Sequence, residues 1–203
     1  MSKQEVIICQ NLNEDLDTAI QNCAHDKLFI LVDKHTRELC LPLISGFDCL
    51  KNAHIITIGP EDIHKNLETL AYVWKELGDQ GATRHSLMIN LGGGMITDLG
   101  GFAASTFKRG FQYINIPTTL LAMVDASVGG KTGINFNGLK NEIGVFSPAE
   151  YVLIDTEFLK SLDSHNLLSG YAEMLKHGII STTEHWAELL NFDLNQIDYK
   201  ALQ

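Results

Sequence analysis

The sequence predicts an α/β protein built on a parallel β-sheet. Short, continuous apolar runs such as KLFILVD (27–33) and HIITIG (54–59) are typical of strands that are buried on both faces. These runs alternate with longer stretches of helical periodicity, which is the pattern of βαβ units. The chain has 203 residues, of which 45% are hydrophobic and 20% charged. A chain of this size and composition can bury one substantial core without disulfides or structural metals.

The elements of the first half follow from the spacing of apolar residues. In chain order we expect a strand at 5–9, a helix at 13–23, strands at 27–33 and 54–59, a helix at 62–78, a strand within 86–94 that runs into three glycines, a helix at 95–107 and a strand at 113–117. The helices are predicted by apolar residues that recur every three or four positions. Pro117 ends the last of these strands, because proline lacks the N–H that a sheet requires.

The regular alternation of strand and helix patterns ends after Pro117. A glycine-rich stretch with short β segments is expected at 127–136 and a strand at 151–155, and from Ser164 onward the pattern is helical. We therefore predict two parts, an α/β nucleotide-type domain at 1–160 and the beginning of a helical domain at 161–203. The second part is expected to be cut short at Gln203.

Composition and charge exclude several classes of protein. The chain carries 25 acidic and 15 basic residues, a formal net charge of −10, which argues against a nucleic-acid partner that would need clustered Lys and Arg. No stretch approaches the roughly 20 apolar residues of a membrane span, and the N-terminus lacks the apolar core of a signal peptide. Cys9, Cys23, Cys40 and Cys49 are widely spaced and form no metal or redox motif. We expect free thiols in a cytoplasmic protein with no membrane partner.

The three glycines Gly92-Gly93-Gly94 lie between a strand and a helix, where α/β sheets bind ligands. Glycine lets the backbone approach a pyrophosphate, and the following helix N-terminus offers free N–H groups. The spacing is not the dinucleotide fingerprint, so a tight turn without a ligand remains an alternative. Asp33 ends the second strand and is either a ribose acceptor or a turn residue. Asp98 is either a ligand contact or a charge that stabilises the helix dipole.

A second polar segment follows the strand at 113–117. It supplies two hydroxyls, a carboxylate, two ammonium groups and an amide, from Thr118, Thr119, Asp125, Lys131, Lys140 and Asn141. Gly130-Lys131-Thr132 is similar to the end of a phosphate-binding P-loop, but Asp125 occupies the position of the required glycine, which excludes a P-loop NTPase. The segment either lines a polar site or is solvated surface.

Glu173, Lys176 and His177 are spaced to share one face of a predicted helix. The glutamate could bind a divalent metal and the lysine an anionic substrate. An ordinary surface ion pair is the alternative.

Together, LGGGMITDLGGFAASTFKRG, INIPTTLLAMVDASVGGKTGIN, LKNEIGVFSP and SGYAEMLKHGII closely resemble the 3-dehydroquinate synthase family. The resemblance runs in register from about residue 88 to 182. It implies a Rossmann-like parallel-sheet N-terminal domain that binds NAD, followed by the start of an all-helical domain that supplies much of the metal and substrate site. It also implies a homodimer in the full-length protein.

The resemblance also assigns roles to individual residues. The implied NAD contacts are Asp33, Asp62, Lys65, Gly93, Gly94, Asp98, Thr118, Thr119, Asp125, Lys131, Lys140 and Asn141. The implied catalytic and substrate-binding residues are Lys131, Asn141, Lys176 and, from the partner subunit, Arg109. Glu173 matches one metal ligand, and none of the eight histidines of the chain matches the family's two metal-binding histidines. The family usually has Gly-Glu-x-x-Lys where this chain has Glu61-Asp62-Ile63-His64-Lys65, so a shorter acid stands at 62.

The implied activity is that of a phosphate-eliminating carbon–oxygen lyase of the shikimate pathway of aromatic amino-acid biosynthesis. It converts 3-deoxy-D-arabino-heptulosonate 7-phosphate to 3-dehydroquinate and phosphate, with catalytic NAD and a divalent metal, zinc or cobalt, which acts as a Lewis acid. The steps are NAD-dependent oxidation, phosphate elimination, reduction and aldol cyclisation.

Four readings stay open for the function. The first is 3-dehydroquinate synthase, with this chain alone expected to be inactive. The second is a related sugar-phosphate cyclase, such as a deoxy-scyllo-inosose or epi-valiolone synthase. The third is a glycerol or iron-dependent alcohol dehydrogenase type, which Lys131, the Lys140-Asn141 pair and the Glu173-x-x-Lys176 pattern disfavour. The fourth is an NAD-binding module without catalysis.

Overall fold

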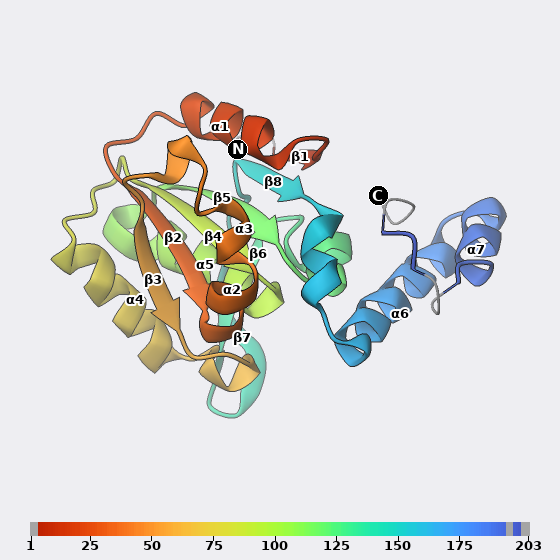
Figure 1. Ribbon diagram of the computed structural model, residues 1–203. Coiled ribbons are helices and arrows are strands. Elements are labelled where there is room, and N and C mark those ends of the chain that lie inside the picture. Colours follow the sequence, from red (N-terminus) through yellow and green to blue (C-terminus); the bar gives the residue numbers. More distant parts are fainter. Residues whose placement is uncertain (1–3, 194–196, 200–203) are drawn as a thin grey trace.

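The computed structural model of the chain describes residues 4–193 and 197–199, and a six-stranded parallel sheet forms its centre (Figure 1). The strand order is β1-β8-β5-β4-β2-β3. The strands are β1 (Glu5–Ile8), β2 (Leu28–Asp33), β3 (His54–Ile58), β4 (Leu87–Gly92), β5 (Gln112–Pro117) and β8 (Tyr151–Ile154). Every residue of β2 and β4 is buried, which agrees with the continuous apolar runs that predicted them.

Helices cover both faces of the sheet. On the first face, Leu28, Ile30 and Val32 of β2 belong to a core shared with α1 (Leu12–Asn22) and α3 (Leu41–Ile44). On the second face, Phe29 and Leu31 belong to a core shared with α4 (Leu67–Asp79) and α5 (Gly94–Thr106). Alternate side chains of one strand therefore enter different cores, as the pleat of a β-strand requires.

A β-hairpin lies outside α5 and makes a further layer on the second face. Its strands, β6 (Lys131–Phe136) and β7 (Leu139–Phe146), are antiparallel, and β6 packs along α5. The turn between them is Asn137-Gly138, and both residues have positive φ. This is the backbone of a tight two-residue hairpin turn, for which Asn-Gly is the preferred sequence.

Two adjacent glycines allow α5 to fit between the sheet and the hairpin. A Cβ atom on Gly100 would overlap the side chain of Asn90 in β4. A Cβ atom on Gly101 would lie 2.6 Å from Cγ2 of Thr132 in β6. No larger residue fits at either position without moving a neighbour, so this glycine pair sets the distance between the three layers.

The remaining helical elements connect the strands or follow the sheet. Short helices lie at η1 (Asp48–Leu50), η2 (Asp62–His64), η3 (Phe107–Arg109), η4 (Ala122–Ala126), η5 (Thr156–Ser161) and α2 (Lys34–Leu39). The chain then forms α6 (Ser164–Ile180) and α7 (Thr183–Leu190), which pack against each other. Figure 1 shows this pair, in blue, extending away from the sheet beyond β8. The division into parts at 1–160 and 161–203 stays a prediction.

Most predicted elements are confirmed, and three differ. The helix expected at 62–78 begins at Leu67, because the side chain of Asn66 caps it by accepting a hydrogen bond from the Thr69 N–H. The stretch 34–44, for which no element was predicted, forms α2 and α3. The β segments expected at 127–136 correspond to β6, and their partner β7 was not predicted.

The structure also describes the state of the cysteines and the character of the helices. All four cysteines are free thiols, and burial raises the pKa of Cys9 to about 12 and that of Cys23 to about 11. Among the described residues, no helix combines the length and the apolar character needed to cross a lipid bilayer.

We predict that Gly100→Ala lowers the free energy of unfolding, because the added methyl group must push α5 away from Asn90 and Leu31. Overpacking of this kind costs about 1–3 kcal/mol. The control is Gly78→Ala in α4, where a Cβ atom would meet nothing within 4 Å. This control should instead gain about 0.5–1 kcal/mol from helix propensity. Urea unfolding followed by circular dichroism measures both. Equal changes in the free energy of unfolding at the two positions would show that α5 can accommodate the added methyl group, against the prediction.

Candidate active site

In this fold the expected place for a ligand crevice is the carboxyl edge of the sheet, between β2 and β4. These two strands are hydrogen-bonded neighbours. The chain leaves β2 toward α2 and α3 on the first face, and leaves β4 toward α5 on the second face. Open α/β sheets bind their ligands at such a point, where the connections diverge.

The N-terminus of α5 forms one wall of this crevice. Gly93 is the N-cap residue, and its carbonyl oxygen accepts hydrogen bonds from the N–H groups of Ile96 and Thr97. The first N–H groups of any α-helix lack a partner within the helix and attract anions. A Cβ atom on Gly93 would lie 3.0 Å from Cγ2 of Thr119, which follows the end of β5. The predicted residues Gly93, Gly94, Thr118 and Thr119 therefore lie together.

Asp33 lies at the end of the neighbouring strand and is buried. Its Oδ1 accepts a hydrogen bond from the Thr36 N–H, while the Thr36 hydroxyl oxygen accepts one from the Asp33 N–H. This reciprocal pair is a capping box that starts α2. The Asp33 carboxylate is therefore held at the mouth of the crevice by the helix that it caps.

The buried Lys65 joins two other predicted site residues, Asp98 and Asn141. Lys65 Nζ donates hydrogen bonds to Asp98 Oδ2 and to Asn141 Oδ1, each at 2.5 Å. The Lys65 side chain is only 6% exposed. Burial raises the pKa of Asp98, and the Lys65 ammonium opposes that shift only in part. Removing one member of such a pair leaves an uncompensated buried charge, at a cost of about 3–5 kcal/mol.

Asp62 lies beside this network at the surface. Its Oδ2 is 3.0 Å from Lys140 Nζ and accepts a hydrogen bond from Asn135 Nδ2 at 3.2 Å. Partial burial raises the pKa of Asp62, but hydrogen bonding and attraction to Lys140 outweigh this and leave it below its usual value. Asn135 also accepts a hydrogen bond from the Asn141 N–H. The loop at 62–65 and the hairpin are thereby connected.

A cavity of about 510 Å³ lies between η4, the hairpin and α5. Four predicted site residues line it: Asp98, Asp125, Lys131 and Asn141. Ala126 also lines it, and its Cβ would lie 3.1 Å from a Cβ placed on Gly94. The cavity therefore lies next to the first turns of α5, and cationic, anionic and amide groups line it.

Residues of α6 extend the site on its other side. Glu173 forms an ion pair with Lys176 and lies 3.4 Å from His177, between Oε1 and Nε2. Hydrogen bonding to Lys176 lowers the pKa of Glu173. The ligand atoms of Asp125, Glu173 and His177 all lie within 4.8 Å of one another. Two carboxylates and an imidazole are donors suited to a divalent metal.

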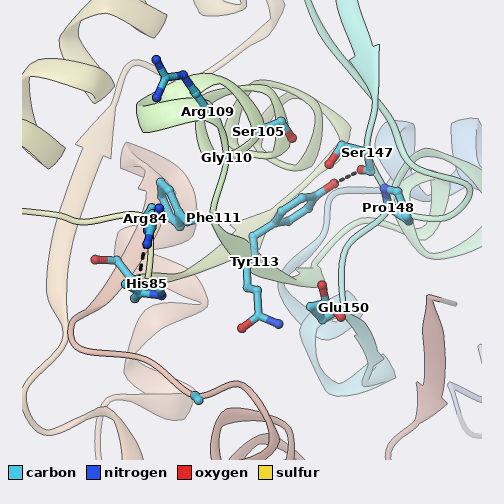
Figure 2. Close-up of a pocket in the computed structure, with 13 residues that line it drawn as sticks. Arg84, His85, Ser105, Arg109, Gly110, Phe111, Tyr113, Ser147, Pro148 and Glu150 are labelled. Carbon is cyan, nitrogen blue, oxygen red and sulfur yellow. Dashed lines mark hydrogen bonds between the residues drawn. The ribbon is translucent and has the colours of Figure 1, made fainter. Parts of the chain in front are cut away.

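Arg109 does not join these residues. It is exposed and lines a different cavity, of about 440 Å³, together with Ser86 and Gln112 at the amino ends of β4 and β5. Figure 2 shows the Arg109 side chain pointing away from Tyr113 at the centre of that cavity. The φ angles of Arg109 and the preceding Lys108 are 73° and 50°. Left-handed backbone at non-glycine residues is strained and is often found at functional sites.

Two residues gain a place in the site that the sequence analysis did not give them. Asn135 bridges Asp62 and Asn141, and its position depends on the hairpin. The Asn137-Gly138 dipeptide between apolar residues was the signal that could have revealed that hairpin. His177 joins Asp125 because α6 packs against η4. No local pattern in the sequence predicts that contact.

Comparison with known proteins gives a consistent family. The family model described as 3-dehydroquinate synthase N-terminal matches residues 55–169. The 3-dehydroquinate synthase of Parabacteroides distasonis is 52% identical over 202 residues, which cover 100% of this chain and 57% of that protein. The chain thus spans little more than half the length of this curated relative.

Two solved structures with a similar fold are sugar-phosphate cyclases. The 2-epi-5-epi-valiolone synthase of Streptomyces hygroscopicus subsp. jinggangensis 5008, solved with NAD⁺ and Zn²⁺, is 32% identical. Its TM-score is 0.77, over 87% of this chain and 49% of that one. A 2-deoxy-scyllo-inosose synthase in complex with carbaglucose-6-phosphate, NAD⁺ and Co²⁺ has a TM-score of 0.82 at 22% identity, over 98% of this chain and 56% of that one. At that identity the likeness concerns the fold alone.

The family match covers more than half of the chain and includes β4, the α5 N-terminus and the hairpin. The relative from Parabacteroides distasonis extends the similarity to the whole chain. The chain therefore belongs to the 3-dehydroquinate synthase family.

Proposed function

We propose that the chain forms the NAD-binding part of a 3-dehydroquinate synthase. The complete enzyme would convert 3-deoxy-D-arabino-heptulosonate 7-phosphate to 3-dehydroquinate and phosphate, a step of the shikimate pathway. In this proposal residues 1–160 form the NAD-binding domain, and 161–203 begin the helical domain that contributes to the metal and substrate site. The free thiols suit the reducing cytoplasm.

One observation carries the proposal. The cavity lined by Lys131, Asn141, Asp98 and Asp125 lies next to the first turns of α5, because Ala126, which also lines it, packs against Gly94. A cofactor phosphate at that N-terminus would place the rest of the cofactor beside a cavity of a size suited to a small-molecule ligand. Cofactor and substrate would then meet in one enclosed space, as hydride transfer requires.

The groups at the carboxyl ends of β2, β4 and β5 suit an NAD molecule. The N–H groups at Gly93 and Gly94 and the hydroxyls of Thr118 and Thr119 suit its pyrophosphate, and Asp33 suits a ribose. Asp62, Lys65, Asp98, Asp125, Lys140 and Asn141 are the further proposed contacts. The bound cofactor would supply a transient oxidation of the substrate C5 hydroxyl. The chain's part is to hold the cofactor and exclude water from the cavity.

The donor set at Glu173 fits a divalent metal such as zinc or cobalt, as in the two cyclase structures. The metal would supply Lewis-acid polarisation of the substrate oxygens. The hydrogen bond from Lys176 lowers the pKa of Glu173 and so favours its ionised form further. Its carboxylate therefore needs no deprotonation at neutral pH before it can act as a ligand.

The proposed substrate carries a carboxylate and a phosphate, which need cationic partners. Lys131 lines the cavity, and Lys176 lies on α6 beside it. Both ammonium groups are exposed, so they can reorient toward an anion without breaking a buried pair. Asn141 offers an amide that Lys65 holds in place. These residues bind and orient the substrate through charge-assisted hydrogen bonds.

We assign Arg109 to the active site of a partner subunit in a homodimer. In its own chain it lies at the amino edge of the sheet, whereas Lys131 and the crevice lie toward the carboxyl edge. The left-handed turn at Lys108 and Arg109 presents the guanidinium outward. A residue that is exposed and strained, and lies apart from its own site, suits a role in a neighbouring one.

A related sugar-phosphate cyclase is the second candidate, favoured by the 32% identity to the valiolone synthase. Both candidates use the same crevice. They differ in the substrate.

The synthase function predicts phosphate release from 3-deoxy-D-arabino-heptulosonate 7-phosphate by the natural protein in which this sequence occurs. With NAD and zinc present, we expect turnover that EDTA abolishes and added zinc restores. Glucose 6-phosphate is offered as the competing substrate. Release from glucose 6-phosphate but not from the heptulosonate would favour the second candidate, and release from neither would refute the synthase function.

NAD binding tests the crevice directly. Gly93→Val places a branched side chain against Thr119 at the N-cap of α5, so we expect the dissociation constant for NAD to rise at least about tenfold. The matched control is Gly46→Val, at a loop position where a Cβ atom would meet nothing within 4 Å. Titration calorimetry measures binding, and circular dichroism checks folding. If the unaltered chain binds no NAD, or if both variants bind equally well, the cofactor assignment is wrong.

A mixing experiment tests the role of Arg109. Arg109→Ala and Lys131→Met should each abolish phosphate release by the natural protein, with Arg37→Ala as the control that retains it. Co-expressed or co-refolded in equal amounts, the two inactive variants should form mixed dimers with one intact site and recover about a quarter of the full activity. If the mixture stays inactive while mixed dimers are shown to form, Arg109 does not act across the interface.

A further inference from the structure

We propose that Asn135 is a positioning residue of the candidate site. Its side chain joins Asp62 and Asn141, which belong to two segments that are far apart along the chain. The inference rests on the proposed function, because both of these residues are proposed NAD contacts. It adds that their placement depends on a single amide in the hairpin.

The pairing of β6 with β7 is interrupted at Asn135. The flanking pairs of the ladder are Ile134 with Ile143 and Phe136 with Leu139. One residue of β6 therefore faces three residues of β7, 140–142. A bulge of this kind releases residues from the ladder and redirects their side chains. Two of the released residues, Lys140 and Asn141, belong to the proposed NAD site, so the bulge is what presents them.

The side chain of Asn135 takes the place of the missing ladder partner. Its Oδ1 accepts a hydrogen bond from the Asn141 N–H at 3.0 Å. The φ angle of Asn141 is 54°, a left-handed backbone that is costly for residues other than glycine and persists only where the surroundings hold it. The hydrogen bond to Asn135 stabilises this backbone. It thereby sets the direction of the Asn141 side chain, whose Oδ1 accepts a hydrogen bond from Lys65 Nζ.

Both partners of the Asn135 amide require the same orientation of that amide. The Asn141 N–H can only donate, so the atom that faces it is the amide oxygen. The amide nitrogen then faces Asp62, where it donates to Oδ2 at 3.2 Å and lies 3.4 Å from the carbonyl oxygen. The backbone N–H of Asn135 donates to the Lys65 carbonyl oxygen at 2.8 Å. Asn135 therefore ties the bulge to the loop at 62–65 through its side chain and its backbone.

A role in the stability of the hairpin alone is the alternative. Loss of the amide would then lower the free energy of unfolding and leave the folded site unchanged. Positioning predicts weaker NAD binding by a folded protein, and a loss that depends on the residue at 62.

The turn of the same hairpin provides a control. Asn137 has a φ angle of 50°, a conformation that glycine adopts freely. Asn137→Gly therefore removes a nearby amide side chain and keeps a sequence, Gly-Gly, that suits the two-residue turn.

The first test is NAD titration calorimetry of the natural protein in which this sequence occurs, with circular dichroism as the check of folding. Asn135→Ala removes both hydrogen bonds of the amide, so we expect the dissociation constant for NAD to rise at least about tenfold. Asn137→Gly should leave it unchanged. Hydrogen exchange of the Asn141 N–H, measured by NMR without NAD, should accelerate at least about tenfold in Asn135→Ala. It should stay slow in Asn135→Asp, which keeps the acceptor.

A double-mutant cycle tests the bridge to Asp62. Asn135→Asp replaces the donor that faces Asp62 with a second carboxylate, and Lys140, which pairs with Asp62, offsets only part of the repulsion. We expect the dissociation constant for NAD to rise at least about tenfold in the otherwise unaltered protein. In the Asp62→Asn background the rise should be less than about threefold, because the new amide can donate to the new carboxylate.

Failure of this inference and failure of the proposed function give different results. If the unaltered protein binds no NAD, the proposed cofactor is wrong, and the exchange of the Asn141 N–H alone decides whether Asn135 holds the bulge. If the unaltered protein and Asn135→Ala bind NAD equally well, Asn135 does not position the site. An equal loss from Asn135→Asp in both backgrounds, or an exchange rate that Asn135→Ala leaves unchanged, would also overturn the inference.

Discussion

The fit of α5 between the sheet and the hairpin is the contact on which the rest of the structure depends. Gly100 admits the side chain of Asn90 and Gly101 admits that of Thr132, so three layers lie closer than larger residues would allow. This packing sets the α5 N-terminus at the carboxyl edge of the sheet. It also brings the hairpin, with Lys131 and Asn141, over the cavity beside that N-terminus. A helix displaced outward would separate the two halves of the site.

The buried Lys65 ammonium group then connects α5 and the hairpin through hydrogen bonds. Its ammonium group binds Asp98 of α5 and Asn141 of the hairpin, while the Asn135 N–H donates to the Lys65 carbonyl oxygen. Three segments distant in the sequence are thus tied at one point. A lysine that already holds two polar partners acts as a positioning residue for them, whatever it contacts in the bound state. The Lys140–Asp62 pair outside it is exposed and contributes little to stability.

A second close approach, at Gly170, connects the sheet to α6 in the same manner. It brings Asp125 of η4 toward Glu173 and His177. The candidate site therefore has two walls, each fixed by glycines that let a helix come near to its neighbour. Arg109 belongs to neither wall, because the strained turn that carries it lies toward the opposite edge of the sheet. We proposed that Arg109 acts in the active site of the partner subunit because of that separation.

The sequence by itself determined the parallel sheet, because short continuous apolar runs that alternate with helical stretches are typical of strands buried on both faces. It also located the glycine turn before α5, and through its motifs the family. It did not predict α2, which begins with the Asp33–Thr36 capping box, or α3, or the partner strand after Asn137-Gly138. Only the tertiary structure decided that Lys65 pairs with Asp98 and Asn141 and that His177 meets Asp125. These contacts join segments that are far apart along the chain, and only the packing of α5 and α6 brings them together.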